Sequence, residues 1–580
     1  MRRSSRFVAL GVSAALLLPP GGAVAQPQTV APAVRVVAGG RPQVTSATAT
    51  PDGVHRVVAL PVAAALRRAT TADQVRAVMA GAPTSGEETV ESEPQSFRAF
   101  DADVAPVGDL DGDKRRDVVA ARITQDGVRF LGLKGSTGVR LWRLDLATGP
   151  DVYPSVQPLR GRGSAGVLLV TRAFSDVADN EATWSATMTT TLHAVDPDGT
   201  VRWSRTYDGT LSASAAAFSA TGLVDVVGVG PAVDRGDDVV VSVTDLAYSA
   251  GAGGKTTVEV IQGATGHTAS VAQASSTDDA PAAGLVGDLD GDGLRDVVVA
   301  SSAATRVSLT AQRGVDGRPL WSQQFDSAPA VWLEAAGDTT GDGVGDVLVY
   351  GFDFWADQPI QATVVSGSDG AAQWSRQTGG AWAVGDIDRD GRADVLTVDD
   401  IWTLRALGYR YVAISGSGRR LWAKSYTVRT PSGGYFAMGG MGLVGDVDRD
   451  RVADAGHEIE LYGASGKKVV ERGVVRSRTG VKAFSGAVGS PLYASLDRRG
   501  DDLISTRRAK GGTTRLVARD GRNGSALWRH SLSAKGVEFV WPRGADLTGD
   551  RRAEVVAMVF TRRGTKVRVL DASGRLLWRR

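Results

Sequence analysis

The chain has 580 residues, with 66 Lys and Arg against 64 Asp and Glu, a formal net charge of +2 and no cysteine. The lack of cysteine excludes disulfides, thiolate metal sites and a cysteine nucleophile. The balanced charge, with basic residues spread along the chain, predicts no nucleic-acid partner. The five histidines lie far apart in the sequence and form no pair at metal-ligand or triad spacing: His55, His193, His267, His457 and His530.

Residues 1–25 have the pattern of an export signal. Arg2, Arg3 and Arg6 precede an apolar stretch from Phe7 to Leu18, and small residues at 23–25 predict cleavage after Ala25. The apolar stretch is too short to span a bilayer, and no later segment approaches twenty apolar residues, so no membrane insertion is predicted. We expect a secreted, extracellular monomer.

Residues 26–96 differ from the rest of the chain. Thr71 and Gln74 have the spacing of a capping box, which predicts one short helix that continues through Met79 and ends before Gly81. Residues 84–95 are acidic and poor in apolar side chains, as in a flexible linker. This segment carries no recognisable chemistry and is expected to be a spacer.

Residues 97–580 contain a repeat of about fifty residues, whose first signature is an acidic loop followed by a β-branched strand. Acidic residues recur at positions one, three, five and nine of the loop. Four loops are complete: Asp109, Asp111, Asp113 and Asp117; Asp288, Asp290, Asp292 and Asp296; Asp386, Asp388, Asp390 and Asp394; and Asp446, Asp448, Asp450 and Asp454. Two loops have threonine at position three and are expected to be weaker: Asp338, Asp342 and Asp346, and Asp546, Asp550 and Glu554.

The second signature is a glycine turn with tryptophan four residues later. The pairs are Gly138/Trp142, Gly199/Trp203, Gly317/Trp321, Gly370/Trp374, Gly418/Trp422, Gly524/Trp528 and Gly574/Trp578. Turns at Gly266 and Gly466 have Ser270 and Val470 in place of the tryptophan. Each unit is therefore expected to run strand, acidic loop, strand, variable loop, strand, glycine turn, tryptophan strand.

Four antiparallel strands per repeat of this length predict an all-β fold, a β-propeller over residues 97–580. An isolated blade would expose both faces, so the blades must stack, and the tryptophan rings are expected to fill the space between neighbours. Because one unit is short and some loops are degenerate, eight blades are expected, with seven to nine as the range.

These motifs resemble known families. The acidic loops and their flanking strands are similar to FG-GAP/VCBS repeats, as in the propeller of integrin α-subunits. The elements GVRLWRL and GRLLWRR resemble the repeats of PQQ-type quinoprotein propellers. The resemblance covers residues 97–580 and implies that the FG-GAP ligand positions apply to the matching residues here.

The acidic loops predict structural calcium sites, four to six in number. Carboxylates this close repel one another unless a cation neutralises them, and oxygen ligands suit calcium. Position twelve is Ala120 or Val299 where an EF-hand needs glutamate, so these are not EF-hands. The alternative, that Asp-Gly pairs only form turns, explains one aspartate per turn and not the repeated pattern.

The chain is expected not to be an enzyme. The resemblance to quinoproteins implies a pair of adjacent cysteines, which is lacking, and no Ser/His/Asp set or isolated carboxylate pair stands out. A binding or scaffolding module for an extracellular or cell-envelope glycan or protein is the leading interpretation. Two alternatives stay open: a secreted enzyme that acts on polysaccharide as a lyase or hydrolase, and a structural spacer in a surface assembly.

A ligand surface is expected on the face opposite the acidic loops. In a meander, the loops after the first and third strands share one face, so the irregular insertions fall on the other. Trp184, Trp355 and Trp402 lie in those insertions and are the candidate ligand-binding residues, because exposed rings serve as platforms for sugars and peptides. The alternative is that the rings cap the ends of the blades. Trp332, Trp382 and Trp541 are expected near the channel mouth on the same face.

Overall fold

The computed structural model describes the propeller region in segments. The described residues are 102–149, 152–160, 165–179, 183–214, 218–248, 253–277, 281–303, 306–326, 330–352, 360–402, 406–429, 435–463, 468–485, 492–508, 513–532, 537–561 and 564–580. The predicted export signal (1–25) and N-terminal segment (26–96) lie outside them.

All regular elements of the described residues are strands, and they fall into four-stranded units in chain order. The first three units are β1 (Ala102–Pro106), β2 (Val118–Thr124), β3 (Gly127–Leu133), β4 (Arg140–Ala147); β5 (Val152–Arg160), β6 (Ala165–Asp179), β7 (Thr183–Val195), β8 (Val201–Ser214); and β9 (Phe218–Gly230), β10 (Asp238–Tyr248), β11 (Gly254–Ile261), β12 (Thr268–Ser276). The next three are β13 (Ala282–Leu285), β14 (Val297–Ala303), β15 (Arg306–Gln312), β16 (Pro319–Asp326); β17 (Ala330–Gly337), β18 (Asp346–Phe352), β19 (Ile360–Val365), β20 (Ala372–Thr378); and β21 (Gly380–Gly385), β22 (Asp394–Trp402), β23 (Ala406–Ile414), β24 (Arg420–Arg429). The last three are β25 (Tyr435–Gly445), β26 (Asp454–Gly463), β27 (Lys468–Val475), β28 (Lys482–Ser485); β29 (Leu492–Ala494), β30 (Asp502–Arg508), β31 (Thr514–Arg519), β32 (Ala526–Ser531); and β33 (Val537–Ala545), β34 (Glu554–Thr561), β35 (Gly564–Leu570), β36 (Leu576–Arg579).

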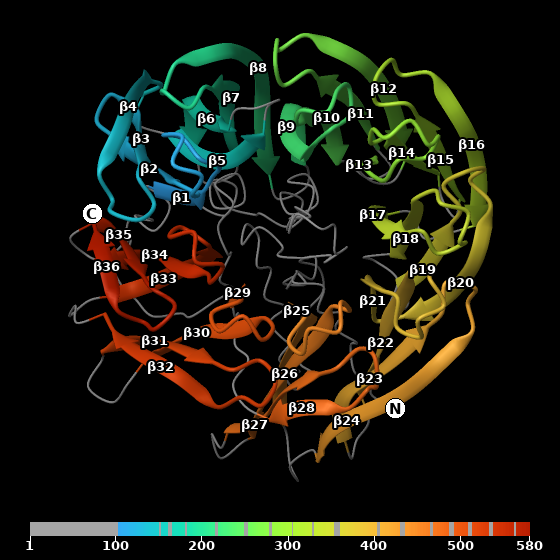
Figure 1. The fold of residues 1–580 in the computed structure, drawn as a ribbon. Helices are drawn as coiled ribbons and strands as arrows, with labels where there is room; N and C mark the ends of the chain where they lie inside the picture. The colour runs from blue at the N-terminus through green and yellow to red at the C-terminus, as the bar shows by residue number, and fades with distance from the viewer. Residues whose placement is uncertain are drawn as a thin grey trace, which may run out of the picture.

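The units stand side by side in a ring, with the first strand of each unit innermost (Figure 1). Each unit is an antiparallel meander, and β8 also pairs with β9 through Thr210–Ala213 and Phe218–Thr221, which joins two blades into one eight-stranded sheet. The predicted all-β propeller is therefore confirmed. The 36 strands make nine blades, at the upper end of the expected range, so the count of eight is corrected by one.

Burial explains why the strands carry these sequences. Every residue of β34 (EVVAMVFT) is buried, because the second strand of a blade has neighbouring blades on both faces. The outer strand β16 (PLWSQQFD) is mostly exposed and buries Trp321. Runs of β-branched residues thus mark the inner strands, and single aromatic residues mark the outer ones.

The tryptophans of the outer strands seal the seams between blades, as predicted. The Nε1 of Trp321 donates to the carbonyl oxygen of Gly367 in the next blade at 2.6 Å, and the ring lies against the turn at Gly370. Gly370 has a φ of 77°, and an added Cβ there would lie 2.6 Å from that ring, so the turn requires glycine. The same contact recurs between other neighbouring blades.

The contact also closes the ring. The Nε1 of Trp578 in the last blade donates to the carbonyl oxygen of Gly135 in the first blade at 2.6 Å, and Arg543 pairs with Asp103 at 3.1 Å. The first and last blades lie next to each other in Figure 1, where the blue strands meet the red ones. Within the part of the chain that the structure describes, side-chain contacts make this junction, and no strand is shared between the two blades.

The seventh blade, β25–β28, departs from the predicted repeat. The turn before its outer strand is at Gly480, with a φ of 67°, and Phe484 stands four residues later. The ring of Phe484 lies against Gly524 of the next blade, where other blades use tryptophan. The assignment of this turn to Gly466 is therefore wrong: Gly466 lies outside the described residues, between the end of β26 at Gly463 and the start of β27 at Lys468, and the turn before the outer strand is at Gly480.

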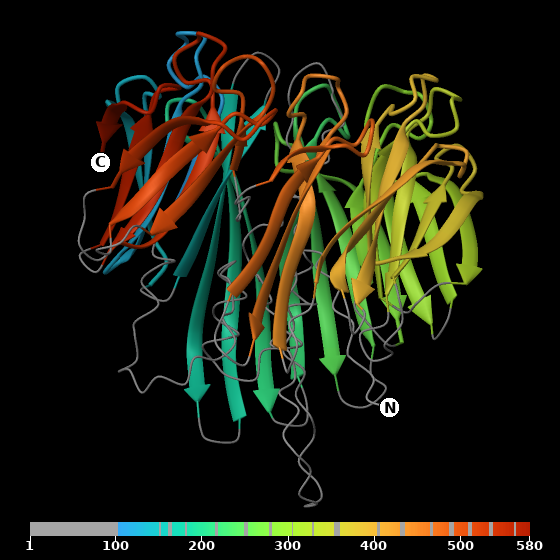
Figure 2. The same cartoon turned by 90° about the horizontal axis from the view of Figure 1, so that it is seen from below.

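The acidic loops and the glycine turns share one face of the ring. The main-chain NH of Gly135, after β3, donates to Asp117 of the first acidic loop at 2.8 Å. Figure 2 shows these loops along the upper edge, whereas β6 to β9 extend beyond the other blades at the lower edge. Among the described residues, no helix is long and apolar enough to cross a membrane.

Candidate metal centres

The first aspartate of each complete loop folds the loop around its own carboxylate. Asp288 Oδ1 accepts from the NH groups of Gly291 at 2.7 Å and Asp292 at 3.1 Å, and its Oδ2 accepts from Gly293 at 2.8 Å. Asp109 makes the equivalent bonds to Gly112, Asp113 and Lys114. Short loops rich in aspartate form such turns because the side chain replaces a main-chain acceptor.

The ninth residue of each loop ties two connections together. Asp117 is buried, and its two oxygens accept from Leu110 NH at 2.7 Å and Gly135 NH at 2.8 Å. Aspartates at this position accept from both sides in seven blades: Asp117, Asp238, Asp296, Asp346, Asp394, Asp454 and Asp502. In the last blade, Glu554 accepts from Leu547 NH at 2.7 Å.

Asp238 and Asp502 were missed by the sequence analysis, which treated their loops as degenerate. Each is the first residue of the second strand of its blade, as Asp346, Asp394 and Asp454 are. An aspartate directly before or at the start of a buried strand is the signal that could have found them.

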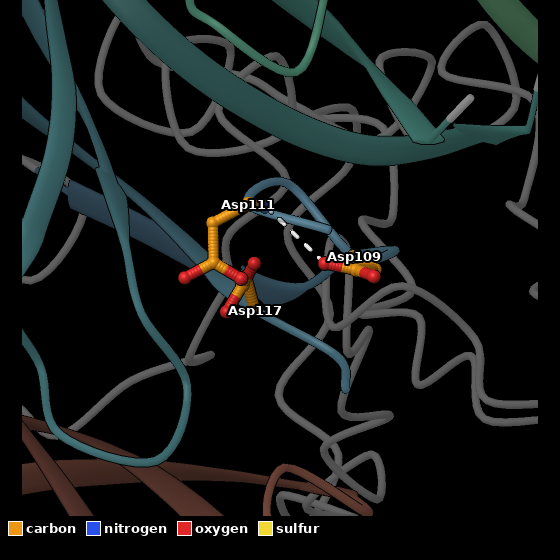
Figure 3. A group of neighbouring side chains, drawn as sticks. All are labelled: Asp109, Asp111 and Asp117. Atoms are coloured by element: carbon orange, nitrogen blue, oxygen red, sulfur yellow. Dashed lines mark hydrogen bonds between the residues drawn. The ribbon is translucent and has the colours of Figure 1, made fainter. Parts of the chain in front are cut away.

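Three carboxylates converge in each complete loop, as Figure 3 shows for Asp109, Asp111 and Asp117. In all four loops, one oxygen from each of positions one, three and nine lies within 4.8 Å of the other two. The groups are Asp109, Asp111 and Asp117; Asp288, Asp290 and Asp296; Asp386, Asp388 and Asp394; and Asp446, Asp448 and Asp454. Oxygens at this separation can share one calcium ion, which binds its ligands at about 2.3–2.6 Å.

The remaining predicted ligands stand apart from these groups. The fifth-position aspartates, Asp113, Asp292, Asp390 and Asp450, are not members. The two weaker loops, with Asp338, Asp342 and Asp346 and with Asp546, Asp550 and Glu554, form no such group among the described residues. Thr340 and Thr548 occupy their third positions, so one carboxylate is lacking there.

Basic side chains from the turn after the third strand reach the outer side of the loops. Lys134 Nζ lies 2.5 Å from Asp111 and 2.9 Å from Asp113. Arg313 pairs with Asp290 and Asp292, both at 2.7 Å. In the loop at Asp386, the residue equivalent to Lys134 and Arg313 is Ser415. Asp388 of this loop pairs instead with Arg419 at 3.3 Å, and the Arg419 side chain is 71% exposed.

The electrostatics of the loops favour a cation. The pKa of Asp296 is raised to about 6, mainly by burial; its two main-chain hydrogen bonds act against the rise, and the charges of Asp290 and Asp292 add to it. Burial likewise raises the pKa of Asp394 to about 6. By contrast, its hydrogen bond with Lys134 is the main cause of the lowered pKa of Asp113. A divalent cation at the converging oxygens would offset both the burial of these two charges and the smaller repulsion from the neighbouring aspartates.

The backbone of two loops is strained at the sixth position. Gly293 and Gly391 have φ values of 84° and 86°, and in the other two complete loops Lys114 and Arg451 adopt 67° and 68°. Residues with a Cβ therefore adopt there a conformation that glycine adopts more readily.

The candidate ligand-binding tryptophans are only partly covered by the structure. Trp184 and Trp402 lie on β7 and β22, but their side chains, and all of Trp355, are outside the described residues. Trp382 is only 2% exposed in the core between the sixth and seventh blades, and Trp332 is half-buried against the core between the fifth and sixth, so neither presents an open ring at the channel mouth. The side chain of Trp541 also lies outside the described residues.

The fold and its loops define a β-propeller with repeated candidate metal sites. Residues 288–349, which span the loops at Asp288 and Asp338, match the family model of an FG-GAP-like repeat, so the predicted resemblance is confirmed. A search among curated proteins found no match.

Three solved structures show how far the similarity extends. The exotype rhamnogalacturonan lyase YesX is 17% identical, with coverage of 80% of this chain and 81% of its own and a TM-score of 0.41. The rhamnogalacturonan lyase PL11 of Bacillus licheniformis is 18% identical, with the same coverage and a TM-score of 0.39. The quinohemoprotein alcohol dehydrogenase ADHIIG of Pseudomonas putida HK5 is 13% identical over 70% of this chain and 65% of its own, with a TM-score of 0.26.

The first two matches correct one prediction. Both proteins are lyases, which contradicts the expectation that this chain is not an enzyme, and that expectation is wrong. At this identity and these TM-scores, however, the similarity assigns neither their activity nor their substrate to the chain.

Proposed function

We propose that this protein is a secreted calcium-binding β-propeller whose acidic loops each hold one structural ion. The observation that carries the proposal is the convergence of three carboxylate oxygens within 4.8 Å, repeated in four blades. Hard oxygen ligands in a flexible loop suit calcium better than the nitrogen- and sulfur-preferring transition metals. Four ions would occupy the complete loops, and the loops at Asp338 and Asp546 would bind more weakly.

The role of the ions is to fix the loop face. The ninth aspartate of each complete loop belongs both to the carboxylate group and to the hydrogen bonds that join the loop to the next turn. An ion held there would therefore link the first and third connections of the blade. It would also remove the repulsion among the aspartates, so calcium would stabilise the folded ring and not the unfolded chain.

The melting temperature tests the proposal. For each site, calcium at a hundredfold excess over Kd contributes about 2.7 kcal/mol to the free energy of unfolding. The full chain is therefore expected to melt several degrees higher in millimolar calcium than in EDTA, with magnesium at the same concentration giving a smaller rise, because magnesium is dehydrated reluctantly. Identical melting curves in calcium and EDTA would contradict calcium binding.

The second candidate function is an extracellular propeller that acts on polysaccharide, and the two lyases named above keep it open. Incubation of the calcium-loaded chain with rhamnogalacturonan would separate cleavage, seen as new chain ends, from binding without turnover. The proposed ligand residues Trp184, Trp355 and Trp402 remain predictions, and their alanine variants belong in the same assay. Export is checked by sequencing the mature protein, which is expected to begin at Gln26.

A further inference from the structure

The positive charge of the protein is concentrated in its last two blades. Residues 492–580 hold 20 Lys and Arg against nine Asp and Glu, a net charge of +11, whereas residues 1–491 hold 46 against 55, a net charge of −9. The expectation that basic residues are spread evenly is therefore wrong at the level of blades. The two basic blades, β29–β32 and β33–β36, are neighbours in the ring (Figure 1).

Four arginines of the eighth blade lie on one face of its sheet, which we call the arginine face: Arg507, Arg515, Arg519 and Arg529. Arg507 is directly opposite Arg515 across β30 and β31, and Arg529 is opposite Val517, which shares a face with Arg515 and Arg519. The pKa of Arg519 is lowered, first by burial and then by the charges of Arg507 and Arg529, which confirms that the three groups are close.

The arginine face points toward the seventh blade and is only partly covered by it. Leu503, on the same face as Arg519, packs with Val474 and Phe484 of that blade. Within the described residues, the outer strand of the seventh blade, β28, has four residues. Arg507, Arg515 and Arg529 are accordingly exposed, whereas Arg519 is half-buried.

These arginines lack the counter-charge that equivalent positions have elsewhere. Within the described part of the chain, no carboxylate lies at ion-pair distance from any of the four, and the buried Nε of Arg519 has no acceptor. In the first blade, the corresponding Arg129 pairs with Asp145 at 2.6 Å. In the fourth blade, the positions equivalent to Val517 and Arg529 hold the neutral residues Thr310 and Ser322, whose side chains are hydrogen-bonded at 3.2 Å.

The ninth blade repeats the pattern. Lys566, Arg568 and Arg579 lie on its corresponding face by register, and the described residues show no ion pair for them. The buried Nε of Arg568 also has no acceptor. Unpaired cations on two adjacent blades cost stability through self-repulsion, which a bound anion would relieve.

We propose that the arginine face docks an acidic polysaccharide, a linear chain with carboxylates on its sugars. The planar guanidinium group of arginine matches a carboxylate with two parallel hydrogen bonds, and several in a row would engage successive acidic sugars. A single-stranded nucleic acid is less suited, because the strand positions that carry the arginine face hold Leu503, Ser505 and Val517 and no aromatic ring for base stacking.

The test measures binding of short oligogalacturonates to the calcium-loaded full chain at physiological ionic strength, with neutral dextran oligomers and single-stranded DNA as comparison probes. The double variant Arg507→Glu and Arg515→Glu is expected to lose about tenfold or more of the affinity, because hydrogen bonds between charged groups are involved. The matched control, Arg420→Glu with Arg429→Glu, changes the same charge at exposed arginines of β24 and is expected to bind like the wild type.

Binding should also weaken as salt is raised. Equal affinity of the wild type and the Arg507/Arg515 variant, or no binding of oligogalacturonate by the wild type, would overturn the proposal. Tighter binding of DNA than of oligogalacturonate would assign the face to nucleic acid instead. None of these outcomes depends on whether the acidic loops hold calcium, so the two proposals fail separately.

Discussion

Within each acidic loop, the aspartates divide between two tasks. The first and ninth fold the loop and tie it to the neighbouring turn through main-chain NH groups. The third joins them at the converging oxygens and also pairs with a basic side chain in all four complete loops. The fifth lies outside the converging group and pairs with a basic side chain in three of them. A carboxylate that already accepts main-chain hydrogen bonds is preorganised, so an ion binding there orders few additional groups.

At the sixth position of the acidic loops, the backbone is left-handed in all four complete loops, whether the residue is glycine or not. A left-handed conformation costs a residue with a Cβ roughly 1–2 kcal/mol. Lys114 and Arg451 carry this cost in two complete loops, and Gly293 and Gly391 avoid it in the others. The loop at Asp386 carries the same cost at its fourth position, where Arg389 has a φ of 67°, so among the complete loops only the one at Asp288 has glycine at both left-handed positions.

Removing a ligand should matter most in the complete loops. Asp290→Ala or Asp388→Ala takes one oxygen from a group of three and is expected to lose about one bound calcium per chain. Asp546→Ala changes a loop without such a group and should lose less. Bound calcium is measured by atomic emission after dialysis, with Asp326→Ala, an exposed aspartate outside the loops, as the control. Equal losses at Asp290, Asp388 and Asp546 would show that completeness of the loop does not set affinity.

The sequence predicted the loops because their pattern is local, and it missed contacts that depend on register. The positions one, three and nine that converge are all within nine residues. Lys134 reaches Asp111 from 23 residues away, and only the pairing of β2 with β3 brings them together. The loops of Asp238 and Asp502 keep only part of the acidic pattern, so a search for complete motifs passed over them.

At the scale of the strand, the outer edge of each blade depends on one aromatic residue. Tryptophan combines a large apolar ring with an NH that reaches the next blade, and Phe484 supplies the ring without the NH. The sequence predicted the tryptophan strands but placed the seventh turn at Gly466, because the Phe484 strand lacks the tryptophan that marks the others.

Truncating one of these rings should weaken a seam. Trp321→Ala leaves a cavity between the fourth and fifth blades and is expected to lower the free energy of unfolding by about 3–5 kcal/mol. Trp321→Phe keeps most of the packing but loses the hydrogen bond to Gly367, and should cost about 1 kcal/mol. Denaturant unfolding of both variants in saturating calcium measures how much the ring packing and the hydrogen bond to Gly367 each contribute to the free energy of unfolding. Equal effects would mean that the ring contributes nothing by packing.

For the whole molecule, the sequence predicted the architecture and miscounted the blades. The repeat identified nine units, but degenerate loops between residues 158 and 275 and the short seventh unit favoured eight. In the structure, both regions form complete blades. The long strands β6 to β9 belong to two joined blades, and the outer strand β28 of the seventh blade is short but present. The number of blades depends on how neighbouring blades pack around the central axis, and the sequence of a single repeat does not determine this packing.

The junction between the first and last blades determines where the ring is expected to open transiently in solution. Elsewhere a chain segment connects neighbouring blades. Here the described residues hold the two blades together through side-chain contacts such as Trp578 with Gly135, and the paired Arg543 and Asp103 are 440 residues apart. Transient separation should therefore begin at this seam, because nothing covalent limits it. Hydrogen exchange is expected to be faster at amides of β1 and β33 than at those of β13 and β17, and uniform protection around the ring would contradict this. The ring would then open and close reversibly at one position, between the first and the last blade.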